Sequence, residues 1–126
     1  MDRWIWLAAG GAAGALGRYV VSGWVQQWAG AGFPWGTVAV NLIGSFALGF
    51  VVQASLLGGW SSELRLFVAV GFLGAFTTFS TFAYEALELL RAGQSWEALG
   101  YVALNVLLGL LLVALGMLAV TALRGW

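Results

Sequence analysis

The 126-residue sequence contains no cysteine, no histidine and no lysine, and it has a single proline. Without cysteine or histidine, the chain has no disulfide, no thiolate nucleophile, no imidazole acid or base and no Cys/His metal site. Only 8% of its residues are charged, whereas a water-soluble domain usually has about 25%. A chain that is 62% hydrophobic cannot cover a soluble globule of this size with polar groups. The sequence therefore predicts an integral membrane protein that lies in a lipid bilayer.

The charge pattern and the motifs exclude several classes of function. Five arginines balance five acidic residues, and no basic cluster is present, which argues against a nucleic-acid partner. The sequence has no phosphate-binding loop, no catalytic pair of carboxylates and no nucleophile elbow. We therefore expect neither an enzyme nor an organic cofactor.

The length limits the number of membrane spans. A spanning helix needs about 20 residues, so four spans with short turns use nearly the whole chain. Residues 19–62 carry no charge, but this run is too long for one span, and Gly30–Pro34 interrupts it. The sequence predicts an all-α integral membrane protein with a single transmembrane domain over residues 1–126. We expect its helices at about residues 4–28, 35–57, 64–90 and 96–123.

Residues near the expected helix ends support these boundaries. Ser61 or Ser62 is expected to cap the third helix, and Ser95 the fourth. The eight tryptophans fall near predicted ends, as in an interfacial aromatic belt; they are Trp4, Trp6, Trp24, Trp28, Trp35, Trp60, Trp96 and Trp126. A cleaved signal peptide is the alternative for the first helix. It is disfavoured because residues 1–3 have no net positive charge and hydrophobic sequence continues beyond any cleavage point.

The arginines barely distinguish the two sides of the membrane. Four spans would place Arg3, Arg65 and Arg124 on one side of the membrane. Arg91 would lie on the other side, and Arg18 would join it if it lies near the far end of its helix. Orientation is normally set by a clear excess of Lys and Arg on the cytoplasmic side. We therefore expect insertion in both orientations. Because four helices are few for enclosing a polar path, we also expect an antiparallel dual-topology homodimer, which would mimic the inverted repeats of larger transporters.

Glycine is abundant, with 19 residues. Gly10, Gly14 and Gly17 are spaced at i, i+4 and i+7, so they share a face of the first helix. In lipid, a face of small residues lets helix backbones approach closely. We interpret these glycines as packing positions, together with Gly44, Gly49, Gly109 and Gly116.

Polar residues inside the spans are harder to explain by packing. An asparagine amide has more donors and acceptors than one helix can satisfy, so Asn41 and Asn105 indicate either interhelical hydrogen bonds or a polar pathway. A charge within a span is costly, and the first helix has no acid between Trp4 and Trp28 to pair with Arg18. Arg18 either extends to the membrane interface or lines an aqueous vestibule that attracts anions.

The third helix has the densest pattern, in residues 71–82. Gly74 and Thr77 favour a break in the helix because glycine and β-branched residues have low helix propensity. A break at membrane depth is tolerated only inside protein or beside a cavity, and its free carbonyls could bind a small cation. Phe79 and Phe82 are three residues apart and share a face, with hydroxyl side chains between them. Aromatic ring edges are electropositive and can face an anion.

Three segments of the sequence resemble the Fluc (CrcB-like) family of fluoride channels. They are Gly17-Arg18-Tyr19, the pattern from Gly36-Thr37 through Asn41 to Gly44-Ser45, and the third-helix pattern from Gly71-Phe72 to Phe82. The resemblance covers essentially the full chain and includes its four-span length. It implies a fluoride-selective channel in the cell inner (plasma) membrane that exports cytoplasmic fluoride passively and confers fluoride resistance. It also implies an antiparallel homodimer with two pores.

The resemblance also assigns expected roles to single residues. The expected pore residues are Asn41, Phe79, Phe82, Ser80, Thr81, Thr37, Tyr101 and Asn105. Asn105 stands where some members have serine. The resemblance implies that Arg18 is the vestibule cation, and Glu85, one turn beyond Phe82, is expected at the pore vestibule. The carbonyls of Gly74 and Thr77 would hold a central, structural sodium ion shared by both subunits.

Two other classes are compatible with a small four-span protein. A proton-coupled multidrug exporter needs an acid within the membrane, yet the first helix carries Arg18 and no acid between Trp4 and Trp28. A non-transporting scaffold would have no reason to collect an asparagine, a phenylalanine pair and a row of hydroxyls. The sequence therefore favours the channel.

Overall fold

The computed structural model describes residues 2–125, which form four long helices joined by short loops. The first two are continuous, and the third and fourth are each divided into segments. Their ends lie within two residues of those expected. The elements are α1 (Asp2–Ala29), α2 (Trp35–Gly58), α3 (Ser62–Arg65), η1 (Leu66–Leu73), α4 (Gly74–Phe76), α5 (Ser80–Arg91), α6 (Ser95–Ala103), η2 (Leu104–Leu108) and α7 (Gly109–Arg124), where η marks π-helical turns.

The helices are suited to a membrane. Trp35–Gly58, Ser62–Arg91 and Ser95–Arg124 are each long and apolar enough to cross a bilayer. Helix α1 is also long enough, with 28 residues, but its glycines and Arg18 make it less apolar. No strand occurs between residues 2 and 125. The chain is thus an all-helical, multi-span membrane protein, as the sequence predicted.

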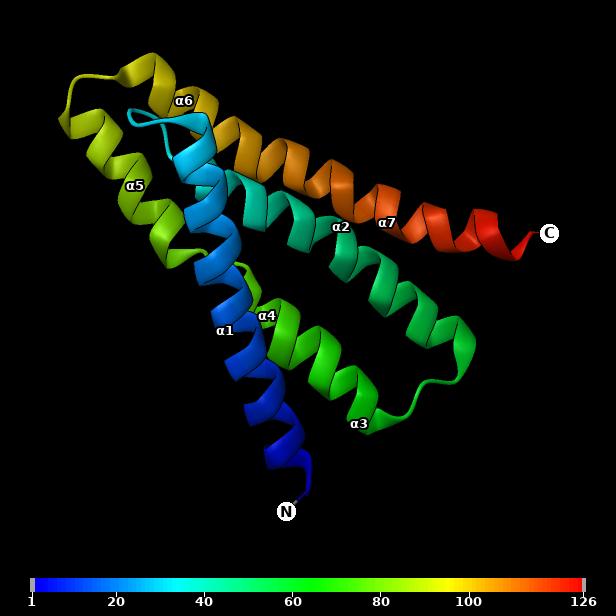
Figure 1. Cartoon of the computed structure of the whole chain (residues 1–126). Helices are drawn as coiled ribbons and strands as arrows, with labels where there is room; N and C mark the ends of the chain where they lie inside the picture. The colour runs from blue at the N-terminus through cyan, green and yellow to red at the C-terminus, as the bar shows by residue number, and fades with distance from the viewer. Residues whose placement is uncertain (1, 126) are drawn as a thin grey trace.

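The helices associate in two pairs. Helix α1 packs along η1 and α4, and α2 packs along α7. The two pairs diverge toward the chain termini in Figure 1, while the loops that join α1 to α2 and α5 to α6 lie at the opposite end. At that end Gln26 fixes the first loop: its Nε2 donates to the carbonyls of Gly30 and Phe33, and its Oε1 accepts from the Gly36 amide.

Glycines make both pairs possible, as expected. A methyl group on Gly10 would overlap the carbonyl oxygen of Phe67, and one on Gly14 would overlap that of Phe72. The backbones of α1 and η1 therefore touch directly. In the second pair, Gly49 and Gly116 have the same role. Gly17 and Gly109 make only ordinary van der Waals contacts.

The two serines that were expected to cap helices behave differently. Ser61 caps the third span, since its hydroxyl accepts from the Leu64 amide 3.2 Å away. Ser95 is not a cap, because the fourth span begins one residue earlier, after Gln94. Trp4, Trp28 and Trp96 are strongly exposed, as residues of an interfacial belt would be. The expected position of Trp126 lies outside the described residues.

The third span is broken, although not at both predicted residues. Gly74 remains helical, with φ −62° and ψ −35°, because its amide still donates to carbonyls in the preceding turn. The chain leaves the helix at Thr77, which is extended, and α5 starts at Ser80. Of the two residues predicted for the break, Thr77 is therefore confirmed and Gly74 is wrong. Low helix propensity alone does not unwind a turn whose hydrogen bonds remain intact.

Candidate functional site

Two cavities lie on either side of the break in the third span. The Arg18 cavity has a volume of about 320 Å³ and is lined by Ala15, Arg18, Tyr19, Ser22, Thr37, Val40, Thr78 and Thr81. The Asn41 cavity has a volume of about 260 Å³ and is lined by Asn41, Gly44, Ser45, Leu48, Thr77, Thr78, Phe79, Phe82, Asn105, Val106 and Val113. Thr78 lines both cavities. The unwound segment is therefore the wall between them.

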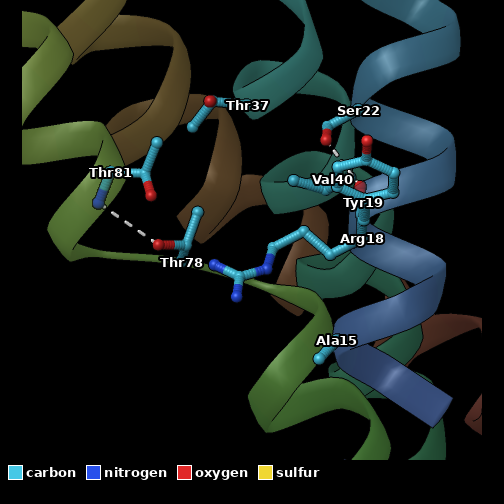
Figure 2. A pocket seen from close by; sticks show the side chains of 8 residues that line it. All are labelled: Ala15, Arg18, Tyr19, Ser22, Thr37, Val40, Thr78 and Thr81. Carbon is cyan, nitrogen blue, oxygen red and sulfur yellow. Dashed lines mark hydrogen bonds between the residues drawn. The ribbon is translucent and has the colours of Figure 1, made fainter. Parts of the chain in front are cut away.

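Arg18 brings an unneutralised positive charge into the first cavity. Its side chain is half-buried, and Figure 2 shows it extending from α1 toward the broken segment at Thr78. The one ion pair within residues 2–125 joins Glu88 to Arg91, 3.1 Å apart on an exposed surface. Arg18 thus faces a polar cavity without a carboxylate partner in the described chain, and an anion would be attracted there.

The hydroxyl groups around Arg18 differ in whether their protons are free. Ser22 donates to the Arg18 carbonyl, and Thr37 donates to Glu85 Oε1 at 2.7 Å. Thr78 Oγ1 instead accepts from the Thr81 amide at 3.2 Å. Neither the Thr78 nor the Thr81 hydroxyl donates to another described residue. A hydroxyl has one proton to give, so Thr78 and Thr81 are available donors beside Arg18. The Tyr19 hydroxyl, which lines the same cavity, also donates to no other described residue.

Asn41 fixes the broken segment. Its Oδ1 accepts from the Thr78 amide at 2.8 Å, and its Nδ2 donates to the Thr78 carbonyl at 3.0 Å. These bonds replace the helical partners that Thr78 lacks. The same Nδ2 also donates to Asn105 Oδ1 at 2.8 Å, and Asn105 Nδ2 donates to the Tyr101 carbonyl at 3.0 Å. Of the two alternatives for these asparagines, interhelical hydrogen bonding is therefore realised, and both residues also line a cavity.

The two phenylalanines are in contact, as their spacing predicted. The ring centroids of Phe79 and Phe82 are 5.7 Å apart and the rings are inclined by 66°. Their surroundings differ, because Phe82 is 8% exposed and packs against Tyr101, whereas Phe79 is 78% exposed. Phe79 belongs to the unwound segment and Phe82 to α5. The pair therefore reaches from the core to the surface of the chain.

Three of the expected pore and vestibule residues lie outside both cavity linings. Glu85 accepts from Thr37 and, at 3.4 Å, from the Tyr101 hydroxyl, so each carboxylate oxygen has a donor. Tyr101 is fully buried between Phe82 and Phe33. Ser80 is exposed at the start of α5. Glu85 and Tyr101 therefore form an internal hydrogen-bonded cluster at the end of the Arg18 cavity where Thr37 lies.

The break leaves main-chain oxygens without partners. No amide among residues 2–125 donates to the carbonyls of residues 74–77. Gly74 is exposed, and Thr77 lines the Asn41 cavity. The described residues contain no cluster of three acidic side chains that could hold a metal. A cation bound here would depend on carbonyl oxygens, which are the ligand type that hard cations prefer.

Sequence reasoning assigned Thr78 no part in ion binding, although it favours a break in the helix together with Thr77. Its position three residues before Thr81 matches the spacing at which a helix N-cap hydroxyl accepts an amide, and this spacing was the available signal. The hydrogen bonds between Asn41 and the Thr78 main chain cannot be predicted from neighbouring residues, because the two residues are 37 positions apart.

A multi-span helical protein whose polar cavities flank a broken span belongs to the class of membrane channels and transporters. Residues 5–117 match the family described as "CrcB-like protein, Camphor Resistance (CrcB)". The chain is 51% identical over 116 residues, 92% of this chain and 91% of the relative, to a protein of Thermus thermophilus named "Fluoride-specific ion channel FluC". Relatives with the same name in Hahella chejuensis and Geobacter sulfurreducens are 50% and 47% identical, over 89% and 87% of this chain and 89% and 86% of their own lengths. The chain belongs to the CrcB-like family.

Proposed function

We propose that the protein is a fluoride-selective channel that lets cytoplasmic fluoride leave the cell passively. The relatives named as fluoride-specific channels match this chain over about nine-tenths of its length. Its function is transport and not catalysis. The inner (plasma) membrane is the proposed location, where such efflux would confer fluoride resistance.

The observation that carries the proposal is the arrangement of donors around the broken segment. Fluoride is small and strongly hydrated, so a selective path must replace its lost water with protein donors, as carbonyls do for cations in other filters. Arg18 would attract the anion, and the free hydroxyls of Thr78 and Thr81 would donate to it. Beyond Thr78, the Asn41 amide and the electropositive ring edges of the phenylalanine pair would contact the ion.

The residues with expected pore roles take unequal parts in this path. Arg18, Thr81, Asn41, Phe79, Phe82 and Asn105 would contact the ion or its nearest neighbours. Thr37 and Tyr101 would act through Glu85, because their hydroxyls donate to its carboxylate. Ser80 would contribute on the exposed surface. The narrow part would then hold no fixed positive charge, so the ion could leave again.

The surface of the broken segment supports a homodimer. Phe79, Ser80 and Thr81 are exposed, yet irregular backbone at membrane depth cannot face lipid. A second copy would cover this surface. The balance of three arginines against two supports insertion in both orientations, so the copies would pair antiparallel and the remainder of the bilayer-facing surface would contact lipid.

A central sodium ion fits the same surface. The carbonyls of Gly74 and Thr77 have no amide partner among the described residues, and their oxygens suit a hard cation. A pair of carbonyls from each copy would then hold one structural ion at the dimer centre. The ion would supply binding energy for assembly and would not be carried with fluoride.

Fluoride efflux from liposomes tests the proposed function. Purified protein is reconstituted into vesicles loaded with potassium fluoride, a potassium ionophore balances the charge, and a fluoride electrode records the release. We expect rapid release of fluoride and negligible release of chloride from matched vesicles. A multidrug exporter or a scaffold would leave fluoride inside, and that result would reject the channel.

A further inference from the structure

Asn41 has no hydrogen-bond donor to spare in this structure. Its two amide hydrogens are directed at the Thr78 carbonyl and at Asn105 Oδ1, and its oxygen accepts from the Thr78 amide. An amide nitrogen has only two hydrogens. An anion in the Asn41 cavity can therefore receive a hydrogen bond from Asn41 only if it displaces one of the present acceptors.

The bonds to Thr78 are the harder ones to displace. They join one amide to both main-chain groups of a residue in the unwound segment, so opening either would leave a main-chain group without its partner. A buried polar group without a partner is costly. The bond to Asn105 joins two side chains, so opening it leaves both main-chain groups of Thr78 with their partners. The acceptor that can leave is therefore Asn105 Oδ1.

The surroundings of Asn105 support this assignment. Asn105 is half-buried and lines the same cavity as Asn41. It lies in the π-helical turns of η2, Leu104–Leu108, and such turns inside helices are frequent at functional sites. Its own amide nitrogen is anchored to the Tyr101 carbonyl at 3.0 Å, which keeps its oxygen directed at Asn41.

We propose that Asn105 Oδ1 is a competing acceptor: it occupies the hydrogen-bonding position on Asn41 in the empty channel, and fluoride displaces it. This inference rests on the proposed function and names the group that sets fluoride affinity within it. The competing oxygen satisfies the Asn41 donor when no ion is present. It also weakens fluoride binding, and an ion must be bound weakly enough to leave if it is to be conducted.

Asparagine-specific isotope labelling tests the competition in the unaltered protein. Asn41 and Asn105 are the only asparagines in the chain, so ¹⁵N-asparagine labelling gives two side-chain amide signals. We expect both signals to shift saturably as fluoride is added to the detergent-solubilised protein and to stay in place with chloride. If fluoride shifts the Asn41 signal while the Asn105 signal stays unchanged, the bond between them does not open and the proposal is wrong.

Two variants of Asn105 should change fluoride affinity in opposite directions. Asn105→Leu removes the acceptor at similar size, so the fluoride concentration that gives half-maximal efflux should fall about three- to tenfold, the range of one neutral hydrogen bond. The maximal rate should fall with it, because the ion leaves more slowly. Asn105→Asp supplies a charged acceptor, which binds donors more strongly, so the half-saturating concentration should rise.

Thr121→Val is the matched control. Thr121 also donates from a side chain to the carbonyl four residues earlier, at 3.2 Å, but it lines neither cavity. Its half-saturating concentration should equal that of the unaltered protein. Equal half-saturation in the control and both Asn105 variants would overturn the competition while leaving the channel intact. Absence of fluoride efflux from the unaltered protein would reject the channel itself.

Discussion

Replacing Asn41 by aspartate tests whether this side chain holds the break open. The change exchanges one NH2 group for an oxygen and leaves the size of the side chain nearly unchanged. The Thr78 amide keeps its acceptor, but the bonds to the Thr78 carbonyl and to Asn105 Oδ1, at 3.0 and 2.8 Å, are lost. In their place a carboxylate oxygen faces two acceptor oxygens.

The size of the effect follows from these two bonds. Leaving a fully buried acceptor without its donor costs about 1–3 kcal/mol. Because Thr78 and Asn105 are half-buried, roughly 2–6 kcal/mol is an upper range for the pair. Proteins are commonly stable by only about 5–15 kcal/mol. We therefore expect Asn41→Asp to lower the free energy of unfolding substantially. The new negative charge beside the path should also abolish fluoride efflux in whatever protein assembles.

Thermal unfolding followed by tryptophan fluorescence, together with fluoride efflux per reconstituted dimer, measures both effects. Gln26→Glu is the matched control: it also exchanges an amide for a carboxylate that faces two carbonyls, those of Gly30 and Phe33. That loop is partly exposed, so water can replace the lost bonds. We expect a small loss of stability and unchanged efflux. If Asn41→Asp unfolds at the temperature of the unaltered protein, the hydrogen bonds from Asn41 do not stabilise the segment at Thr78.

Four further outcomes are expected. Gly14→Val should prevent folding because its side chain would overlap the Phe72 carbonyl, whereas Gly11→Val, with open space around it, should leave expression and the gel-filtration profile unchanged. If the two variants behave alike, the close packing of α1 is contradicted. Phe79→Ile should cut efflux at least about threefold, since an aromatic edge contact is worth about 0.5–1.5 kcal/mol. It should cost little stability because the ring is 78% exposed, and unchanged efflux would remove Phe79 from the path. Two or three lysines added at the N-terminus should lock one orientation and lower fluoride efflux, and coexpression with an oppositely biased variant should restore the efflux. If labelling of engineered terminal cysteines finds a single orientation in the protein without added lysines, dual insertion is refuted. Anomalous diffraction should locate a cation bound by carbonyls at the dimer centre, and efflux that followed the sodium gradient would instead indicate a coupled carrier.

Much of the fold could be read locally. The spans follow from apolar, sparsely charged runs of the right length, and the end of the first follows from Gly30–Pro34. The faces of small residues on α1 and α2 follow from helical spacing, because residues three and four apart share a side. The position of the break could not be read in this way. Gly74 has the lower helix propensity of the two candidates, yet the chain breaks at Thr77, next to the residue that Asn41 binds.

Individual site residues show the same contrast between what local sequence predicts and what the tertiary structure decides. The spacing of Phe79 and Phe82 predicted their contact, but not that one ring is buried and the other exposed. Thr37 was expected to donate to an anion, yet in the folded chain its proton goes to Glu85 at 2.7 Å. A hydroxyl bonds whichever acceptor the fold brings near. Its partner is therefore not a property of the surrounding sequence.

The sequence by itself determined that the chain lies in a membrane, because 8% charge and 62% apolar residues cannot form a soluble surface. It also determined the number of helices and indicated the residue types that are proposed to meet an anion. Only the tertiary structure decided which donors are free. Asn41, Thr78 and Asn105 lie on three different spans, and hydrogen bonds between residues 37 and 64 positions apart form only when helix packing brings them within 3 Å of each other.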